Sequence, residues 1–519
     1  MEVDRIGGGL TMLLSSRNAA RSLALVPALL AVLAVTAAWG SVIISKAVTR
    51  RMSCAANICT PTAANAVLNA ADLQAMLASA SVTVKSQSSA QDIVVAAPLT
   101  WTSGITLTLD AWRSLTVNQP VSVTGVGGLS VLTNDGGSDG HFSFGARGRV
   151  TFASLSSPLT INGSAYMLAN SIAGLAGAMA TGSSGFYALA NSYDAAPDGV
   201  YPAPPIGTKT SGYGTVFQGT LEGLGNTISN LAIGDPAGYT AGMVGQNRGL
   251  IENLVLSKAN VSGGELVGGL AGSNENGSLF GDAVDEAMIS APRNGTAGVL
   301  AGETLFGSIT NCRTSGSVSG ATVGGLVGYS NNTVSGSSSS ARVEGSQDFM
   351  VGGLIGENQG GITTSYATGA VAGGQFLGGL VGYTDVGSIS NAYATGAVAK
   401  NPTRGGASIG GLAGHTQNVK ISSAYASGAP TGPAGSPIGG LIGSDTTSGT
   451  ASQTYWDITT SGIGNLSQGA GSPANDPGIT GLTTTQLQAG LPPGFDPAVW
   501  GEDPNVNGGL PYLLANPPQ

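Results

Sequence analysis

Short runs in which apolar and polar residues alternate begin near Val82 and recur to about residue 163. SVTVKS, ITLTLDAW and SLTVNQPVSVTG are examples, and the runs stop at Gly, Asn or Pro. Such alternation is typical of half-buried β-strands bounded by turns. Residues 61–80 instead combine good helix formers with apolar residues at helical spacing. The pattern therefore predicts a short helical or linker segment at 52–81 and a strand-rich, solenoid-like region at 82–163.

A second and stricter pattern repeats between residues 217 and 450. An apolar residue in a small-residue setting is followed two positions later by Gly, as in GLVG and GLIG. The copies lie 26 to 32 residues apart, a period that is the signature of a solenoid or propeller. A less regular connection at 164–216, with a Pro-rich segment, separates the two regions. The apolar anchors of the copies are Met243, Leu270, Leu300, Leu326, Leu354, Leu380, Leu412 and Leu441.

Glycine content decides between the kinds of repeat architecture. The chain holds 84 Gly, and each interior helical Gly costs about 1 kcal/mol, so stacked helices are excluded. Propeller blades need about 40–50 residues, more than this period supplies. The predicted fold is all-β, a right-handed parallel β-helix (β-solenoid) of about eight coils over 217–450. Residues 451–519, with Trp456, Trp500 and Tyr512, are expected to cap its open end, because solenoids need a cap to stay soluble.

Tyrosines recur near turns and strand starts of the repeats. We expect them to stack coil on coil, with contact to a glycan as the alternative role. They are Tyr329, Tyr366, Tyr383, Tyr393 and Tyr425.

The first 51 residues differ from the rest. Arg17 and Arg21 precede an apolar run at 23–44, and small residues occur up to Ala38. This arrangement fits a secretory signal cleaved after Ala38, but the run is also long enough to span a bilayer as a single transmembrane helix. Both interpretations place the body outside the cytoplasm, secreted or at the cell surface. Contact with a membrane is expected only through 23–44, if the segment is not cleaved.

Charge excludes some classes of partner. The formal net charge is −9, and the residues after Arg51 carry 13 basic and 26 acidic side chains without basic runs. Such a body does not suit binding to nucleic acid or to an anionic membrane. Hydrophobic residues reach 41%, which favours an ordered chain over a disordered one.

Few residues carry reactive chemistry. Cys54 and Cys59 are close enough in sequence for one local disulfide in an oxidising compartment, and Cys312 is expected to be a buried small residue. His141 and His415 lie outside any H-E-x-x-H motif, and ligands for a metal ion are too few. We therefore predict no catalytic residue, no metal and no cofactor.

Weaker features concern an enzymatic alternative. Ser408 lies in a G-x-S-x-G string seven residues before His415, but such strings arise by chance in a chain rich in Gly and Ser. Glu357 and Asp385, at similar places in neighbouring coils, are the carboxylates that a polysaccharide-active enzyme would use. The acidic stretch GDAVDEA at 281–287 is expected to be a solvated loop between coils.

The repeats also resemble a known family. The pattern GLxG-x-N-x-G…SYATG is similar to the GLUG repeat of bacterial surface and secreted proteins. Residues 92–125 resemble the β-helical stretches of the filamentous-haemagglutinin-like exoprotein family, and residues 156–171 and 216–233 resemble the beginning of its repeats. The ending, SQTYWDITTSGIG…GGLPYLL, looks like the terminus of that family. The likeness covers about 82–515.

This resemblance implies a non-catalytic, adhesin-like protein that attaches through an extended repeat surface. Its partners would be a surface glycan or protein ligand and an outer-membrane exporter. Long members of the family carry an amino-terminal secretion domain with NPNG-type motifs, which we do not find here, so the export route stays open. The residues leave two alternatives, a polysaccharide-active β-helix enzyme and a purely structural envelope or matrix component.

Overall fold

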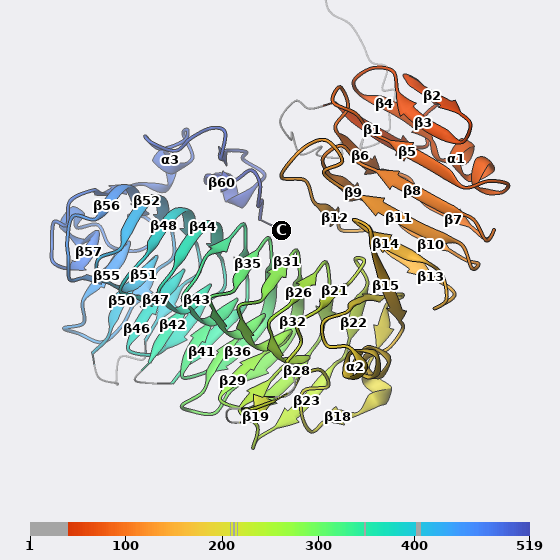
Figure 1. The fold of residues 1–519 in the computed structure, drawn as a ribbon. Helices are drawn as coiled ribbons and strands as arrows, with labels where there is room; N and C mark the ends of the chain where they lie inside the picture. Colours follow the sequence, from red (N-terminus) through yellow and green to blue (C-terminus); the bar gives the residue numbers. More distant parts are fainter. Residues whose placement is uncertain are drawn as a thin grey trace, which may run out of the picture. The chain divides into compact units, whose positions relative to one another are not determined.

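The computed structural model describes residues 40–518 apart from 208, 211–212, 215, 347–348 and 401–405. In this range the chain folds into a right-handed parallel β-solenoid of about 15 turns, which confirms the predicted fold class (Figure 1). Two hydrophobic cores fill the solenoid. We call residues 40–163 the first solenoid and residues 164–482 the second solenoid.

The first solenoid begins earlier than the strand pattern predicted. Strand β1 (Ser41–Ser45) places Val42 and Ile44 in the core, each 0% exposed. The end of the apolar run 23–44 is therefore a core strand rather than part of a membrane helix. Its side chains alternate between the core and the surface, but this alternation was hard to recognise in the sequence because apolar residues precede it without a break. The rest of that run, with the predicted cleavage after Ala38, lies outside the described residues. Among the described helices, none is long and apolar enough to cross a membrane.

Three sheets wind around the first core. One has the order β12 (Phe142–Phe144), β9 (Leu115–Val117), β6 (Asp92–Val95), β1 and β4 (Ala66–Asn69). Another has the order β13 (Val150–Phe152), β10 (Val121–Val123) and β7 (Leu99–Trp101). The third contains β2 (Met52–Ala55), β3 (Ile58–Pro61), β5 (Val82–Lys85), β8 (Thr106–Asp110), β11 (Gly128–Leu132) and β14 (Leu159–Ile161). Helix α1 (Ala70–Leu77) packs against this core and confirms only part of the helical segment predicted at 61–80, because Ala66–Asn69 form the strand β4. The helical or linker segment predicted at 52–81 also contains β2 and β3, so this part of the prediction is wrong.

The predicted irregular connection contains a helix that closes the second core. Strand β15 (Ser164–Ala169) pairs antiparallel with β14 and parallel with β16 (Phe186–Leu189). Between them, α2 (Ile172–Thr181) begins after Ser171, whose hydroxyl accepts a hydrogen bond from the Gly174 N–H, an ordinary N-cap. Ile172 and Leu175 of this helix are 0% exposed in the second core. The helix therefore covers the start of the second solenoid.

Each coil of the second solenoid contributes strands to three sheets. The eight-stranded sheet has the order β24 (Thr240–Ala241), β29 (Leu266–Gly268), β33 (Thr296–Gly298), β37 (Thr322–Gly324), β42 (Met350–Gly352), β46 (Phe376–Gly378), β50 (Ser408–Gly410) and β54 (Ile438–Gly439). The nine-stranded sheet has the order β25 (Val244–Asn247), β30 (Ala271–Glu275), β34 (Ala301–Leu305), β38 (Val327–Ser330), β43 (Ile355–Asn358), β47 (Val381–Thr384), β51 (Ala413–Thr416), β55 (Ile442–Asp445) and β57 (Ala470–Ser472).

The remaining sheet of the second solenoid, which we call the long sheet, carries the candidate site. Its strands include β21 (Thr220–Glu222), β26 (Leu250–Glu252), β31 (Ser278–Phe280), β32 (Ala283–Ser290), β36 (Arg313–Gly320), β40 (Ser338–Ser339), β41 (Arg342–Gly345), β44 (Gly361–Ala367), β48 (Ser388–Ala394), β52 (Lys420–Ala426), β56 (Ala451–Asp457) and β58 (Ile479–Leu482). Successive coils pair in parallel and in register, so equivalent side chains form rows along this sheet.

The eight predicted anchors, from Met243 to Leu441, all lie in the second core, and none is more than 1% exposed. The chain turns between the eight- and nine-stranded sheets at these anchors. The glycine that follows the anchor is required by the close approach of coils. A Cβ atom on Gly382 would lie 2.4 Å from the Val351 nitrogen and 2.6 Å from the Gly356 oxygen, both backbone atoms of the preceding coil. The repeated GLxG motif is thus explained by packing alone.

The carboxyl-terminal segment does not form the simple end cap that we predicted for 451–519. Strand β56 belongs to the last coils, with Trp456 fully buried in the second core. After β58 and the short α3 (Thr484–Leu487), the chain runs back along the long sheet (Figure 1). The Asn516 side chain donates to the Thr364 carbonyl oxygen at 3.3 Å, and the Tyr366 hydroxyl donates to the Pro517 carbonyl oxygen at 3.3 Å. We call residues 484–518 the strap.

A row of tyrosines explains the path of the strap. Tyr366, Tyr393 and Tyr425 occupy the same position in successive coils, and their rings stack at 4.7 and 5.2 Å within 7° of parallel, so the predicted coil-on-coil stacking is confirmed for these three. The row faces out of the bore and would leave aromatic surface in water. Trp500 of the strap, 1% exposed, covers it and donates its indole N–H to Asn391 Oδ1 at 3.1 Å.

Candidate functional site

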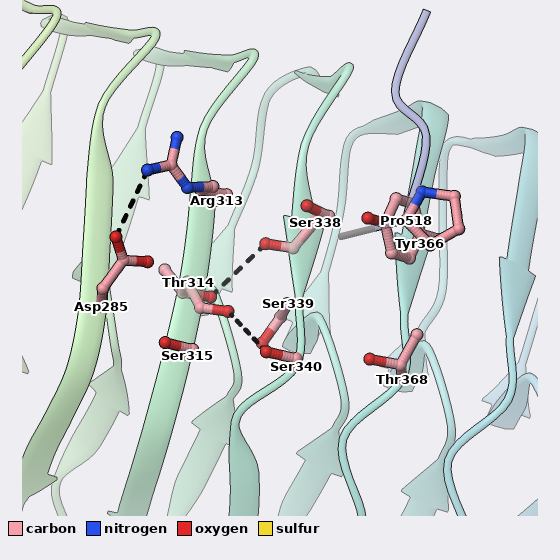
Figure 2. A pocket seen from close by; sticks show the side chains of 10 residues that line it. All are labelled: Asp285, Arg313, Thr314, Ser315, Ser338, Ser339, Ser340, Tyr366, Thr368 and Pro518. Carbon is pink, nitrogen blue, oxygen red and sulfur yellow. Dashed lines mark hydrogen bonds and ion pairs between the residues drawn. The ribbon is translucent and has the colours of Figure 1, made fainter. Parts of the chain in front are cut away.

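Two adjoining cavities on the outer surface of the long sheet share Asp285 and Arg313. The first, of about 300 Å³, lies between the turn at 144–149 of the first solenoid and coils of the second solenoid. The second, of about 140 Å³, continues across the next coils to Tyr366 and Pro518 of the strap. Figure 2 shows that Arg313 and Asp285 lie at one end of the second cavity and Pro518 at the other. We call the two cavities together the groove.

An irregularity in the repeat positions the central ion pair. Strands β32 and β36 pair in parallel, but their register shifts between Val284 and Ala287, where Glu286 adopts a positive φ of 54°. Such a bulge re-aims the side chains next to it. Asp285 lies in the bulge and accepts from Arg313 at 3.3 Å between Oδ2 and Nη2 (Figure 2). The prediction of a solvated loop at 281–287 is therefore wrong, because Ala283 and Val284 pair with the coils on both sides and most of the stretch is buried.

The first cavity gathers positive charge. Arg147 and Arg149 of the first solenoid line it together with Arg313, and both are exposed. No carboxylate of the described residues lies within 4.0 Å of either guanidinium, whereas Arg113 and Arg248 are each paired with an acid. The chain as a whole carries a net charge of −9, so this cavity differs in sign from the average surface. It is suited to an anionic group.

Hydroxyl groups make up most of the remaining polar lining. Thr227 and Ser192 face the first cavity. Among the hydroxyl residues around the second cavity, Ser315, Ser340 and Thr368 are at least partly exposed, whereas Thr314, Ser338 and Ser339 are buried. The Ser340 hydroxyl donates to the Thr314 oxygen at 3.4 Å, and the Thr314 hydroxyl donates to the Gly325 oxygen at 2.8 Å. The groove thus combines guanidinium groups at one end with a row of hydroxyls.

Three carboxyl groups, two of them buried and that of Glu252 half-buried, lie in the coils next to the first cavity but do not line it. Glu222 and Glu252 occupy the same position in adjacent coils, and Asp282 follows in the next coil. The Glu222 oxygens accept from the Leu224 N–H at 2.7 Å and from the Asn253 amide at 3.0 Å, and Asp282 accepts from the Leu254 N–H at 3.0 Å. Burial raises the pKa of Glu222 and of Asp282, and it raises the pKa of Glu252 to about 7. This cluster was not predicted, although acids recur at equivalent places in TLEG (220–223) and LIEN (250–253).

The carboxylates considered for the enzymatic alternative lie on a different sheet. Glu357 aligns with Tyr329 and Tyr383 in adjacent coils of the nine-stranded sheet. Burial, and secondarily the nearby Asp385, raise the pKa of Glu357. Tyr383 stacks on His415 at 5.0 Å, so the imidazole serves in a ring stack. The structure therefore does not bring Glu357 and Asp385 into the groove.

The cysteines, His141 and Ser408, which the sequence also singled out, lie in places that serve the fold. Cys54 and Cys59 face each other in the β2–β3 hairpin and are joined by a disulfide, and Cys312 is a buried free thiol. The ring of His141 lies against that of Phe280, with centroids 4.8 Å apart and planes tilted by 35°. Ser408 lies in the eight-stranded sheet, and no hydrogen bond between it and a histidine occurs in the described part of the chain. The same part holds no group of three His, Cys, Asp or Glu residues that could bind a metal ion.

Comparison with known proteins supports the repeat assignment. The model of the GLUG motif matches residues 373–399. Over 63 residues the chain is 43% identical to halomucin of Haloquadratum walsbyi. The matched segment is 12% of this chain but only 1% of halomucin. A solved structure named “putative immunoglobulin A1 protease”, from Bacteroides ovatus, is 18% identical with a TM-score of 0.38, covering 68% of this chain and 93% of that one. The chain is thus a β-solenoid that contains a GLUG motif and resembles halomucin over a short segment.

Proposed function

We propose that this chain is a non-catalytic, adhesin-like protein, secreted or displayed at the cell surface, that binds its ligand along the groove. The observation that carries the proposal is the groove itself, a polar surface that extends over several coils and contains cationic and hydroxyl groups. Repeat solenoids use such extended surfaces for binding. The GLUG motif and the resemblance to halomucin agree with this role, as does the likeness of the flanks to filamentous-haemagglutinin-like exoproteins.

A polysaccharide-active enzyme is the second candidate, because Glu222 and Glu252 form a pair of carboxyl groups with raised pKa values. Glycosidases that retain configuration hold two carboxyl groups about 5 Å apart, and adjacent coils have a similar spacing of about 4.8 Å. However, Glu222 is 0% exposed, its oxygens accept two hydrogen bonds from the protein, and neither carboxyl group lines the groove. A glycan in the groove would not reach them, so binding is the better-supported function.

Binding and turnover of the full-length protein on the same ligands separate the candidates. Fluorescently labelled protein would be titrated on intact cells and on an array of neutral and acidic glycans, and soluble glycans would be assayed for released reducing ends. Saturable binding without release supports the adhesin-like function. Release that is lost in Glu252→Gln would establish the enzyme instead. The absence of both saturable binding and turnover would leave a purely structural envelope or matrix component. Protease treatment of intact producing cells checks the proposed location, since an exposed protein is digested.

A further inference from the structure

We propose that the first cavity of the groove holds the carboxylate or sulfate group of an acidic glycan between Arg147, Arg149 and Arg313, and that the glycan chain continues over the hydroxyls of the second cavity. This inference rests on the proposed binding function and names the class of ligand.

The three arginines are suited to an anion. A guanidinium stays charged at all relevant pH values, and its planar fork can donate two hydrogen bonds to one carboxylate or sulfate. Arg147 and Arg149 have no carboxylate of the described residues within 4.0 Å, so their donors are available. In the described part of the chain, Asp285 is the one acid paired with Arg313, at 3.3 Å and with both side chains partly exposed. An arriving anion competes with that single pair.

The lining favours a glycan over an acidic peptide. Beyond the arginines, the polar lining of the groove consists mainly of serine and threonine hydroxyls from successive coils, and Tyr366 and Pro518 add apolar surface at the far end, on which the apolar face of a sugar ring can pack. Hydroxyls can both donate and accept, as the hydroxyl groups of a sugar do. A peptide would instead need edge strands or apolar pockets for its side chains. The long sheet offers no free edge at this place, because its strands are paired on both sides along the groove.

Nearby acids do not oppose the anion strongly. Burial favours the neutral form of Glu222, Glu252 and Asp282, the three carboxyl groups next to the cavity. Asp285 is the remaining acid in the lining, and it faces Arg313 directly. Its removal would therefore strengthen binding of an anion, whereas damage to the fold would weaken it. This opposite sign makes Asp285 a decisive position for a test.

The test measures binding of defined polymers to immobilised full-length protein by interferometry. Polygalacturonate presents carboxylates, dextran sulfate presents sulfates, dextran is the neutral control, and polyglutamate is the acidic peptide. The variants are the double substitution R147Q/R149Q, D285N, and R342Q, which removes one positive charge at an exposed position on β41 outside the groove. We expect polygalacturonate or dextran sulfate, but not dextran, to bind. The double variant should weaken this binding at least about tenfold, because two charge-assisted contacts are lost.

D285N should tighten binding, because Arg313 no longer pairs with Asp285 and can donate to the anion. The gain should be only about threefold, because partly exposed ion pairs of this kind contribute little free energy. R342Q should leave binding unchanged. An unaltered dissociation constant in R147Q/R149Q, or weaker binding in D285N, would overturn the inference. Equal affinity for polyglutamate would show a general anion site and refute the glycan class. If neither acidic glycan binds while cells or neutral glycans still do, this inference fails and the proposed function stands; if nothing binds, the proposed function fails as well.

Discussion

Replacement of Glu252 should change how the stability of the protein depends on pH. Burial raises the pKa of this carboxyl group from its ordinary value of 4.5 to about 7, and the carboxyls of Glu222 and Asp282 lie beside it without a cationic partner in the described residues. Between these two pH values the folded state keeps a proton that the unfolded chain releases. Stability is therefore fully present below about pH 4.5 and falls as the pH rises toward 7.

The size of the effect follows from the two pKa values. A difference of one pKa unit corresponds to about 1.36 kcal/mol. The rise of the pKa of Glu252 from 4.5 to about 7 therefore lowers the free energy of unfolding by about 3 kcal/mol between pH 4.5 and pH 7. Glu222 and Asp282 add losses of the same sign, since burial raises their pKa values too. Glu252→Gln removes the titration of one group while keeping its shape.

Urea unfolding at pH 4.5 and pH 7.5, followed by circular dichroism, checks this reasoning. Wild-type protein should lose stability between the two pH values, and the loss in E252Q should be smaller by about 3 kcal/mol. E252Q should also be the more stable of the two at pH 7.5. Glu265→Gln, at an exposed position, is the control and should follow the wild type. The same pH dependence in E252Q and wild type would refute the account of the buried cluster.

Two further predictions concern packing. Gly382→Ala should destabilise the repeats by about 1–3 kcal/mol, because its Cβ meets backbone atoms of the preceding coil, whereas Gly361→Ala, with no neighbour closer than 3.7 Å, should be nearly neutral in thermal unfolding. Trp500→Ala should weaken docking of the strap by about 3–5 kcal/mol, because the indole is buried on the tyrosine row. Limited proteolysis with mass spectrometry should then show cleavage after residue 483 while the coils remain intact; a strap that stays protected would contradict this view of the tyrosine row.

The repeat sequence made the second solenoid predictable. Its anchors recur every 26 to 32 residues, and each interacts mainly with the coil before and the coil after, so local spacing carries the architecture. The start at β1 was missed because Val42 and Ile44 continue an apolar run whose earlier part suggested a signal or anchor. The strap was missed because Trp500 was assigned to the open end, while its partners, Tyr393 and Tyr425, are distant in sequence.

The groove could not be predicted from the repeats because it forms where the repeats are broken. Residues that match the consensus of a solenoid fill the bore, form tight turns and stack coil on coil, so few of them are accessible to a ligand. The groove instead combines the 144–149 turn of the first solenoid, the bulge that re-aims Asp285, and Pro518 of the strap. None of these belongs to the GLxG pattern, and only the folded chain brings them together. The spacing of 30 residues between Leu270 and Leu300, which contains the bulge, lies within the range of the other copies, so the period of the repeat did not reveal the site. Binding residues in a regular solenoid are therefore best sought where the pairing of its coils becomes irregular.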